Sequence, residues 1–200
     1  MTSFEFWFSI GSTYSYLTVA RLDAAARAEG VEIAWRPFSV RAIMREQANS
    51  PFGNKPVKAA YMWRDIERRA GLYGLPVKVP APYPLVEFDL ANRVALVGMA
   101  EGWGHAYCRA TYRRWFVEGL EPGQEPNLSD SLREAGQDPA RVVAQAQGEA
   151  IGATYLAATQ TARELGIFGS PSFVVGREVF WGDDRLDDAI AWFRRGTLAR

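Results

Sequence analysis

Short apolar runs and helical spacing alternate along the first part of the chain. Residues 3–10 form a nearly continuous apolar run, which is typical of a strand buried on both faces. Leu17, Ala20 and Ala24 then recur at helical spacing, and residues 31–36 alternate between apolar and polar positions. This order predicts a β-α-β unit whose strands are parallel and joined by a right-handed crossover.

The middle of the chain, from about residue 41 to residue 165, contains no convincing strand pattern. Proline-rich segments separate its first helical stretches and mark a later loop. The apolar spacing predicts helices over residues 58–74, 90–101, 106–117, 129–135, 141–147 and 149–165.

Strand character returns near the end of the chain. Residues 170–175 read as a strand entered through a proline, Gly176-Arg177 as a tight turn, and residues 178–181 as the second strand of a hairpin. A single apolar stripe that begins at Leu186 predicts a final amphipathic helix. The whole order predicts an α/β fold, in which a thioredoxin-like domain (residues 1–40 and 166–200) is interrupted by an all-helical insertion domain (residues 41–165).

The corner between the first strand and the first helix carries the pattern Ser-x-x-Ser, from Ser12 to Ser15. Redox proteins of the thioredoxin type carry Cys-x-x-Cys at this corner. A helix N-terminus stabilises an anion and lowers the pKa of a thiol bound there. Ser12 is therefore a candidate to bind a thiolate that the chain does not itself supply, although serine is also a preferred helix N-cap.

Three further places are candidates for ligand contacts. In a thioredoxin-like fold Pro171 is expected to follow a cis peptide bond and Ser170 to offer its backbone to a peptide ligand, the alternative being a trans proline that opens a strand. Asp183 and Asp184 can bind an ammonium group or cap the last helix. Asn54 can contact a ligand through its amide or simply form a turn with its neighbours.

Composition narrows the class of protein. The chain has 200 residues with 23 basic and 23 acidic side chains, so its net charge gives no reason to expect nucleic acid or an anionic membrane as partner. Cys108 is the sole cysteine and excludes an intramolecular disulfide, while His105 is the sole histidine and is expected to be structural. No cluster suggests a metal site. With neither a signal peptide nor a membrane span in the pattern, we expect a cytoplasmic protein.

Three segments, in this order and spacing, resemble the family of 2-hydroxychromene-2-carboxylate isomerases and kappa-class glutathione transferases. They are residues 8–17, residues 53–62 with Gly53-Asn54-Lys55-Pro56, and residues 166–186 with Phe180-Trp181-Gly182-Asp183-Asp184-Arg185-Leu186. The resemblance spans nearly the whole chain, and the last of these motifs looks closer to the isomerase branch.

The resemblance implies a glutathione site. It implies that Ser12 contacts the glutathione sulfur, that Ser170, next to Pro171, holds the cysteine backbone, and that Asn54 and Asp184 line the site. We place Asp183 in the glutathione site as well, although relatives often have a neutral residue there and a second carboxylate would repel the γ-glutamyl carboxylate. Thr13 replaces a proline that is frequent in the family, which changes loop stiffness more than chemistry.

The expected function is therefore a glutathione-dependent isomerase that acts on an unsaturated aromatic carboxylate, and resemblance suggests a homodimer. Two alternatives stay open at this point. One is a glutathione transferase, which uses the same thiolate but releases a conjugate. The other is a catalytically silent thioredoxin-like module that binds peptides along the Ser170-Pro171 edge.

Overall fold

A single four-stranded sheet organises the computed structural model, which describes residues 3–49, 52 and 54–199. Its strands are β1 (Phe4–Phe8), β2 (Ala34–Pro37), β3 (Ser172–Val175) and β4 (Glu178–Trp181), in the order β2-β1-β3-β4. β1 runs parallel to β2 and antiparallel to β3, and β3 and β4 form an antiparallel hairpin. The predicted parallel pair and hairpin are thus both confirmed.

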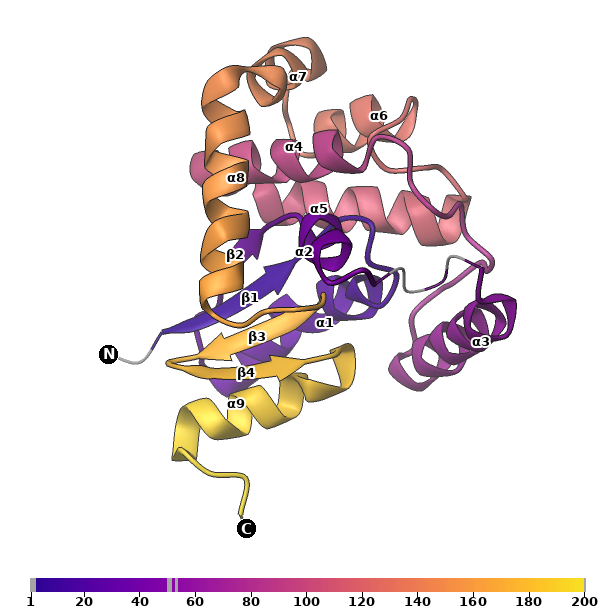
Figure 1. The fold of residues 1–200 in the computed structure, drawn as a ribbon. Coiled ribbons are helices and arrows are strands. Elements are labelled where there is room, and N and C mark those ends of the chain that lie inside the picture. The colour runs from indigo at the N-terminus through magenta and orange to yellow at the C-terminus, as the bar shows by residue number, and fades with distance from the viewer. Residues whose placement is uncertain (1–2, 50–51, 53, 200) are drawn as a thin grey trace.

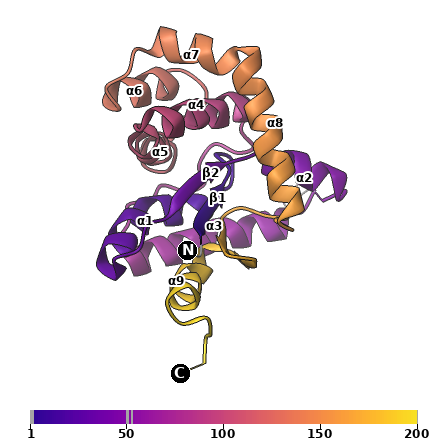
Figure 2. The ribbon, with the colours of Figure 1, turned by 90° about the vertical axis from the view of Figure 1, so that its left-hand side faces the viewer.

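Helices cover the two faces of the sheet (Figure 1). α1 (Ser15–Glu29) and α9 (Leu186–Arg195) lie on one face, where both line the same groove. On the other face, α4 (Phe88–Glu101) and α8 (Glu149–Glu164) both contact β2. Figure 2 shows α6 (Asn127–Glu134) and α7 (Pro139–Gln147) beyond α4, on the side away from α9.

The middle segment is helical, as predicted. Its other helices are α3 (Pro56–Tyr73), α5 (Gly104–Arg113), α6 (Asn127–Glu134) and α7 (Pro139–Gln147), and α5 continues as a π-helix over Arg114–Glu118. The bounds differ from the predicted ones by a few residues at most, apart from the change from α-helix to π-helix within 106–117. The division into two domains at residues 40 and 165 stays a prediction.

One helix was not expected. α2 (Val40–Glu46) follows β2 directly, and the Ser39 hydroxyl caps it by accepting a hydrogen bond from the Ala42 N–H at 3.3 Å. Only Val40 and Ile43 of this helix are buried. With seven residues, the helix is shorter than the stretch over which a helical period can be recognised, which explains why the sequence pattern did not indicate it.

Aromatic rings fill the core on both sides of β1. Phe6 stacks on Phe8 with ring centroids 5.0 Å apart and meets Trp35 of β2 edge-on at 5.1 Å. Phe173, on the other neighbouring strand β3, has its ring centroid 5.5 Å from that of Phe6. These four side chains are at most 4% exposed, so the core holds the central strand, and with it the start of the Ser12 corner, in a fixed place.

Two glycines allow α4 and α5 to pack closely. A Cβ atom on Gly98 would lie 2.6 Å from the Cα of Gly104 and 2.8 Å from the Trp103 ring. Backbone cannot move away from such a contact as the tip of a side chain can, so the position admits no side chain without a shift of the helices.

We expect Gly98→Ala to lower the free energy of unfolding by about 1–3 kcal/mol because of this clash. Gly71→Ala is the matched control, since Gly71 lies inside α3 and a Cβ atom added there would have no neighbouring atom within 4 Å. There the free energy of unfolding should instead rise by about 0.5–1 kcal/mol, because alanine favours helix. Urea denaturation measures both, and effects of the same sign would contradict a clash specific to Gly98.

Candidate functional site

The corner after β1 is joined to the start of β3. The Ser12 hydroxyl donates a hydrogen bond of 2.6 Å to the carbonyl oxygen of Ser170. The Ser170 hydroxyl accepts from the Ser9 N–H at 2.9 Å and lies 3.0 Å from the Ser15 hydroxyl. The Ser170-Pro171 bond is cis, as expected. The structure therefore brings together Ser12, Ser170 and Pro171, which the sequence had indicated as parts of one site.

Ser12 is not a helix cap. α1 begins at Ser15, its N-cap position is Tyr14, and no side chain caps it. Residues 12–14 form tight turns in which the N–H of Ser15 reaches the Ser12 carbonyl at 3.3 Å. Within the described part of the chain, the N–H groups of Thr13 and Tyr14 have no hydrogen-bond acceptor. Two backbone donors are thus available at the corner for an anion, and the Ser12 hydroxyl joins them only when it leaves the Ser170 carbonyl.

A cavity of about 610 Å³ opens beside this corner, between α2, the start of α3 and the segment that leads into α4. Its wall is mainly apolar and aromatic, and includes Met44, Met62, Tyr83 and Phe88. The basic side chains on it are Arg41, Arg45 and Lys58, and no carboxylate occurs among the described residues that line it. Such a space suits a planar, anionic molecule.

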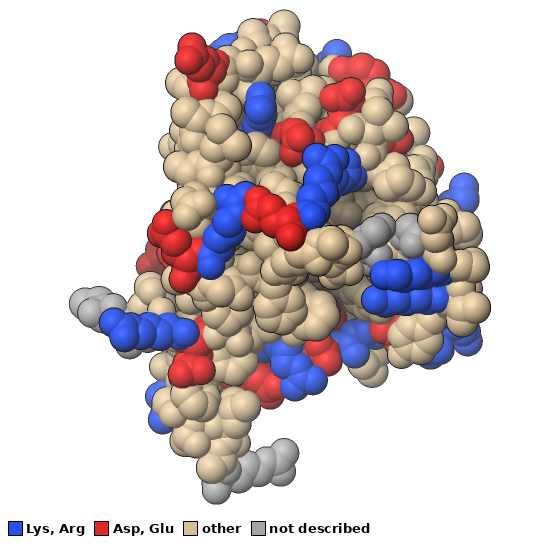
Figure 3. Space-filling view, in the orientation of Figure 1, with Lys and Arg blue, Asp and Glu red and all other residues tan. Residues whose placement is uncertain are grey.

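A second cavity of about 340 Å³ adjoins the first and shares Tyr14, Tyr61, Ser170 and Trp181 with it. Here the charge is different, because the lining contains Asp65, Asp183 and Asp184 together with a single basic residue, Arg69. Over the face drawn in Figure 3, acidic and basic side chains are interspersed. The separation of charge thus belongs to the two cavities, which meet at Ser170.

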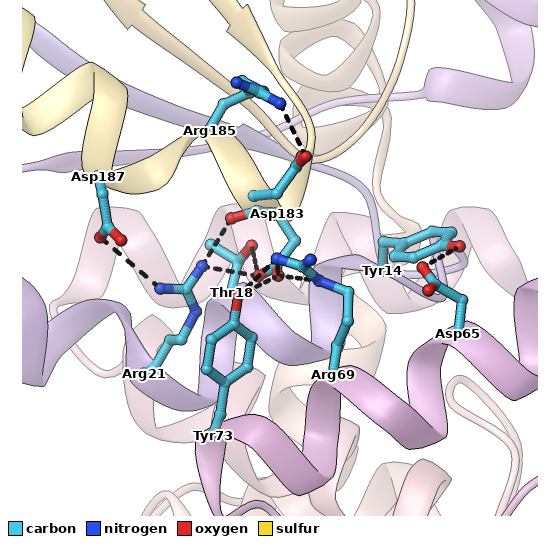
Figure 4. Close-up of polar contacts among 10 residues, drawn as sticks. Tyr14, Thr18, Arg21, Asp65, Arg69, Tyr73, Asp183, Arg185 and Asp187 are labelled. Carbon is cyan, nitrogen blue, oxygen red and sulfur yellow. Dashed lines mark hydrogen bonds and ion pairs between the residues drawn. The ribbon is translucent and has the colours of Figure 1, made fainter.

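Asp183 is buried at the floor of the smaller cavity, where four side chains surround its carboxylate (Figure 4). One carboxylate oxygen accepts from Thr18 at 3.0 Å and from Arg21 at 3.1 Å. The other accepts from Arg69 and Tyr73, both at 3.2 Å. Burial and, after it, the Asp183 charge raise the pKa of Tyr73 above its ordinary value. Both carboxylate oxygens of Asp183 thus have partners within the fold. Its contact with glutathione stays a prediction.

The two other predicted contacts lie in different surroundings. Asp184 is half exposed on the lining of the smaller cavity and pairs with Arg185 at 2.9 Å, so it faces a ligand more openly than Asp183 does. Asn54 is exposed and lies outside the lining of both cavities. Its φ of +55° is typical of a turn, which was the alternative interpretation of this residue. Gly53, its partner in the predicted turn, lies outside the described residues.

The sequence did not indicate several of the lining residues. Arg41, Arg45 and Asn49 come from α2 and the segment after it, where no helix was expected. Tyr14 lines both cavities and donates to Asp65 at 3.0 Å, and burial together with that carboxylate raises the Tyr14 pKa well above its usual range. The sequence could have indicated these lining residues only through their neighbours: Tyr14 stands within the Ser-x-x-Ser corner, and the others precede the segment around Lys58.

Cys108 and His105 lie apart from the site. Cys108 is fully buried, and burial raises its thiol pKa far above the ordinary value, so it is not a ready nucleophile. His105 stacks on Trp35 with ring centroids 4.3 Å apart and lies 3.4 Å from Asp23. The described residues contain no group of three metal-ligating side chains. None of the helices they form has the length and apolar character to cross a membrane.

This chain is similar to known proteins over most of its length. A family model of the DsbA-like thioredoxin domain matches residues 4–190. The 2-hydroxychromene-2-carboxylate isomerase of Sphingobium xenophagum is 29% identical over 92% of this chain and 93% of its own length. The kappa 1 glutathione S-transferase of Caenorhabditis elegans is 24% identical over 91% of this chain and 86% of its own.

A solved structure shows the same similarity in three dimensions. The structure of a 2-hydroxychromene-2-carboxylate isomerase superposes with a TM-score of 0.84 at 27% identity, covering 96% of each chain. Together with the family match, this confirms the resemblance and the thioredoxin-like fold that the sequence predicted.

The Asp183 cluster yields a prediction on stability. Asp183→Ala should lower the free energy of unfolding by about 2–4 kcal/mol, because Arg21 and Arg69 then lose their shared, buried partner. Asp187→Ala is the control, since Asp187 is 87% exposed and 4.0 Å from Arg21; we expect a change within about 0.5 kcal/mol. Denaturation at low and high salt measures both, and equal losses for the two variants would contradict the role of the cluster.

Proposed function

The chain belongs to the DsbA-like thioredoxin domain family, and on this premise we propose that it is a glutathione-dependent isomerase of the 2-hydroxychromene-2-carboxylate isomerase type. The corner that carries a dithiol in redox relatives here carries Ser12 and Ser15, and Cys108 is too deeply buried to replace it. A reaction at this corner therefore needs a thiol from outside the chain.

The observation that carries the proposal is the pair of cavities of opposite charge that meet at Ser170. Glutathione has an ammonium group at one end, carboxylates at both ends and a thiol between them. The smaller cavity offers Asp184 to the ammonium group, and the larger one offers Lys58 and Arg45 to a carboxylate. Ser12 lines the larger cavity beside Ser170, where the two cavities meet, so the residues present fit the cofactor.

Asp183 does not oppose this fit. The two guanidinium groups of Arg21 and Arg69, at 3.1 and 3.2 Å, more than offset its single negative charge. Arg69 extends from α3 and both contacts Asp183 and lines the smaller cavity. Its presence supports binding of the γ-glutamyl carboxylate beside a buried aspartate, because its positive charge opposes the repulsion expected from the sequence.

Ser12 and Ser170 would act together. In the structure the Ser12 hydroxyl is donated to the Ser170 carbonyl. When a peptide N–H takes that carbonyl instead, as in strand addition, the Ser12 hydroxyl is free to turn toward a sulfur anion. The N–H groups of Thr13 and Tyr14 reinforce it, since charge-assisted hydrogen bonds are about twice as strong as neutral ones.

Bound glutathione would supply a thiolate that adds reversibly to a conjugated carbon; the double bond becomes single, rotation or ring opening follows, and elimination of the thiolate restores the double bond and returns glutathione. The larger cavity would hold the unsaturated substrate. Its aromatic wall packs on the ring, and Arg41, the basic lining residue not assigned to glutathione, pairs with the substrate carboxylate. We propose a cytoplasmic homodimer as its working form.

Glutathione transfer is the second candidate, because a kappa-class transferase is among the relatives. The two reactions use the same site and differ in whether glutathione leaves. Incubation with an aromatic electrophile and mass analysis of the product distinguishes them. We expect no net incorporation of glutathione into the substrate, and stoichiometric conjugation would favour the transferase.

Ser12→Ala tests the proposed site. Loss of a hydrogen bond to a charged sulfur should reduce turnover of 2-hydroxychromene-2-carboxylate by about 10- to 100-fold, since such bonds are worth about 1.5–3 kcal/mol. The absorbance change on conversion to trans-o-hydroxybenzylidenepyruvate measures turnover. Ser129→Ala, at an exposed hydroxyl that contacts Glu125, is the control and should leave turnover unchanged.

The same assay without glutathione tests the cofactor. We expect turnover to disappear, and calorimetric titration of glutathione to show binding at millimolar concentration or below. Equal turnover in its absence would refute the glutathione requirement, and an unaltered rate in Ser12→Ala would refute the role of that hydroxyl.

A further inference from the structure

The backbone that leads from β1 to Ser12 is held by side chains rather than by a neighbouring strand. β1 ends at Phe8, and the next two residues, Ser9 and Ile10, are fully buried. Buried N–H and C=O groups need hydrogen-bond partners. The Ser9 N–H donates to the Ser170 hydroxyl at 2.9 Å, and the Ser9 carbonyl accepts from the Tyr112 hydroxyl at 3.0 Å and from the Ser12 N–H at 2.9 Å.

Ile10 is satisfied by a single side chain, Asn92 of α4. The Asn92 Oδ1 accepts from the Ile10 N–H at 2.8 Å, and its Nδ2 donates to the Ile10 carbonyl, also at 2.8 Å. The same amide nitrogen donates to the Phe88 carbonyl at 2.8 Å. Asn92 is fully buried, and both its donor hydrogens are used.

The chemistry of these partners requires an amide. Ile10 presents one donor and one acceptor side by side, and an asparagine side chain carries the complementary pair on one planar group. An aspartate would keep the acceptor but lose both donors, and a leucine of similar size would lose all three bonds. The assignment of oxygen and nitrogen in Asn92 follows from the partners, since the reverse would set N–H against N–H.

The contact also fixes the wall of the substrate cavity. Gly11 follows Ile10 with φ of +125°, and a Cβ atom there would lie 2.4 Å from the Phe88 ring. Phe88 and Gly11 both line the larger cavity next to Ser12. Through its bonds to Ile10 and Phe88, Asn92 thus ties the corner and the cavity wall to each other.

We infer that Asn92 is a positioning residue for the proposed isomerisation: from a helix of the middle segment, it holds the Ile10–Ser12 corner in the place where Ser12 meets a bound sulfur. It does not touch the cavity itself, so it acts through Ile10 and Gly11. The inference rests on the proposed function for its effect on turnover. Its effect on the order of the corner does not depend on that function.

Asn127 provides a matched control. It too is a fully buried asparagine, and it donates to the carbonyls of Thr111 and Leu120 at 3.2 and 2.8 Å. Its oxygen accepts from the hydroxyls of Thr111 and Ser131. Asn127 begins α6, and no residue of that helix lines either cavity. Loss of a buried amide should therefore lower the stability of variants at either position. Only loss of the Asn92 amide should also affect the site.

The experiment compares Asn92→Ala and Asn92→Leu with Asn127→Ala in the full chain. Hydrogen exchange of the peptide over residues 9–14 should speed up at least about tenfold in the Asn92 variants and less than twofold in Asn127→Ala, because only the former release the corner. With glutathione present, kcat should fall about tenfold or more in the Asn92 variants, and the pKa of the bound thiol should rise. Asn127→Ala should keep kcat within about twofold of the wild type at matched folded fraction.

Asn92→Leu fills the space of the amide and tests the inference if the alanine variant does not fold. Unchanged exchange over residues 9–14 in a folded Asn92 variant would overturn the inference, and so would equal losses of kcat in the Asn92 and Asn127 variants. If the wild-type protein neither binds glutathione nor converts the substrate, the proposed function fails. The exchange of the corner then still decides whether Asn92 holds it.

Discussion

The hydrogen bonds around Ser170 connect two parts of the chain that are more than 150 residues apart. Its carbonyl accepts from Ser12 and its hydroxyl accepts from Ser9, so the end of β1 and the start of β3 are joined on both sides of the corner. This junction fixes Ser12 and Ser170 relative to each other at the place where the two cavities meet. The site is in this sense built at the boundary between the first and the last segment of the chain.

The middle segment does more than cover the sheet. α3 contributes Arg69 to the cluster around Asp183, α4 contributes Asn92 to the corner, and α5 contributes Tyr112. Each reaches a different backbone or side-chain group of the thioredoxin-like part. The polar interior of the site is therefore satisfied from both parts of the fold, and the apolar core around Phe6 likewise continues into α4 and α5.

Much of this arrangement was predictable from the sequence, for identifiable reasons. Strand and helix periods are local properties, so the order of elements and the helical middle segment followed from spacing. Ser12, Ser170 and Asp184 stand beside element boundaries that motifs mark. The partners of Asp183 were not predictable, because Arg21 and Arg69 are ordinary arginines on two separate helices and nothing local links them to residue 183. Asn92 gave no signal either, since a single polar residue in an apolar helix does not indicate what it bonds to.

Hydrogen bonds between the insertion and the thioredoxin-like part bear on whether the insertion can be removed. An interrupted domain is often regarded as a host that could be restored by excising its insertion and joining the flanking ends. Here excision of residues 41–165 would remove Asn92, Tyr112, Arg69 and Tyr73 together. The excised host would be left with the Ile10 backbone groups unpaired and with one guanidinium, Arg21, against the Asp183 carboxylate. The thioredoxin-like part of this chain is thus a topological unit whose buried polar groups depend on the insertion for their partners.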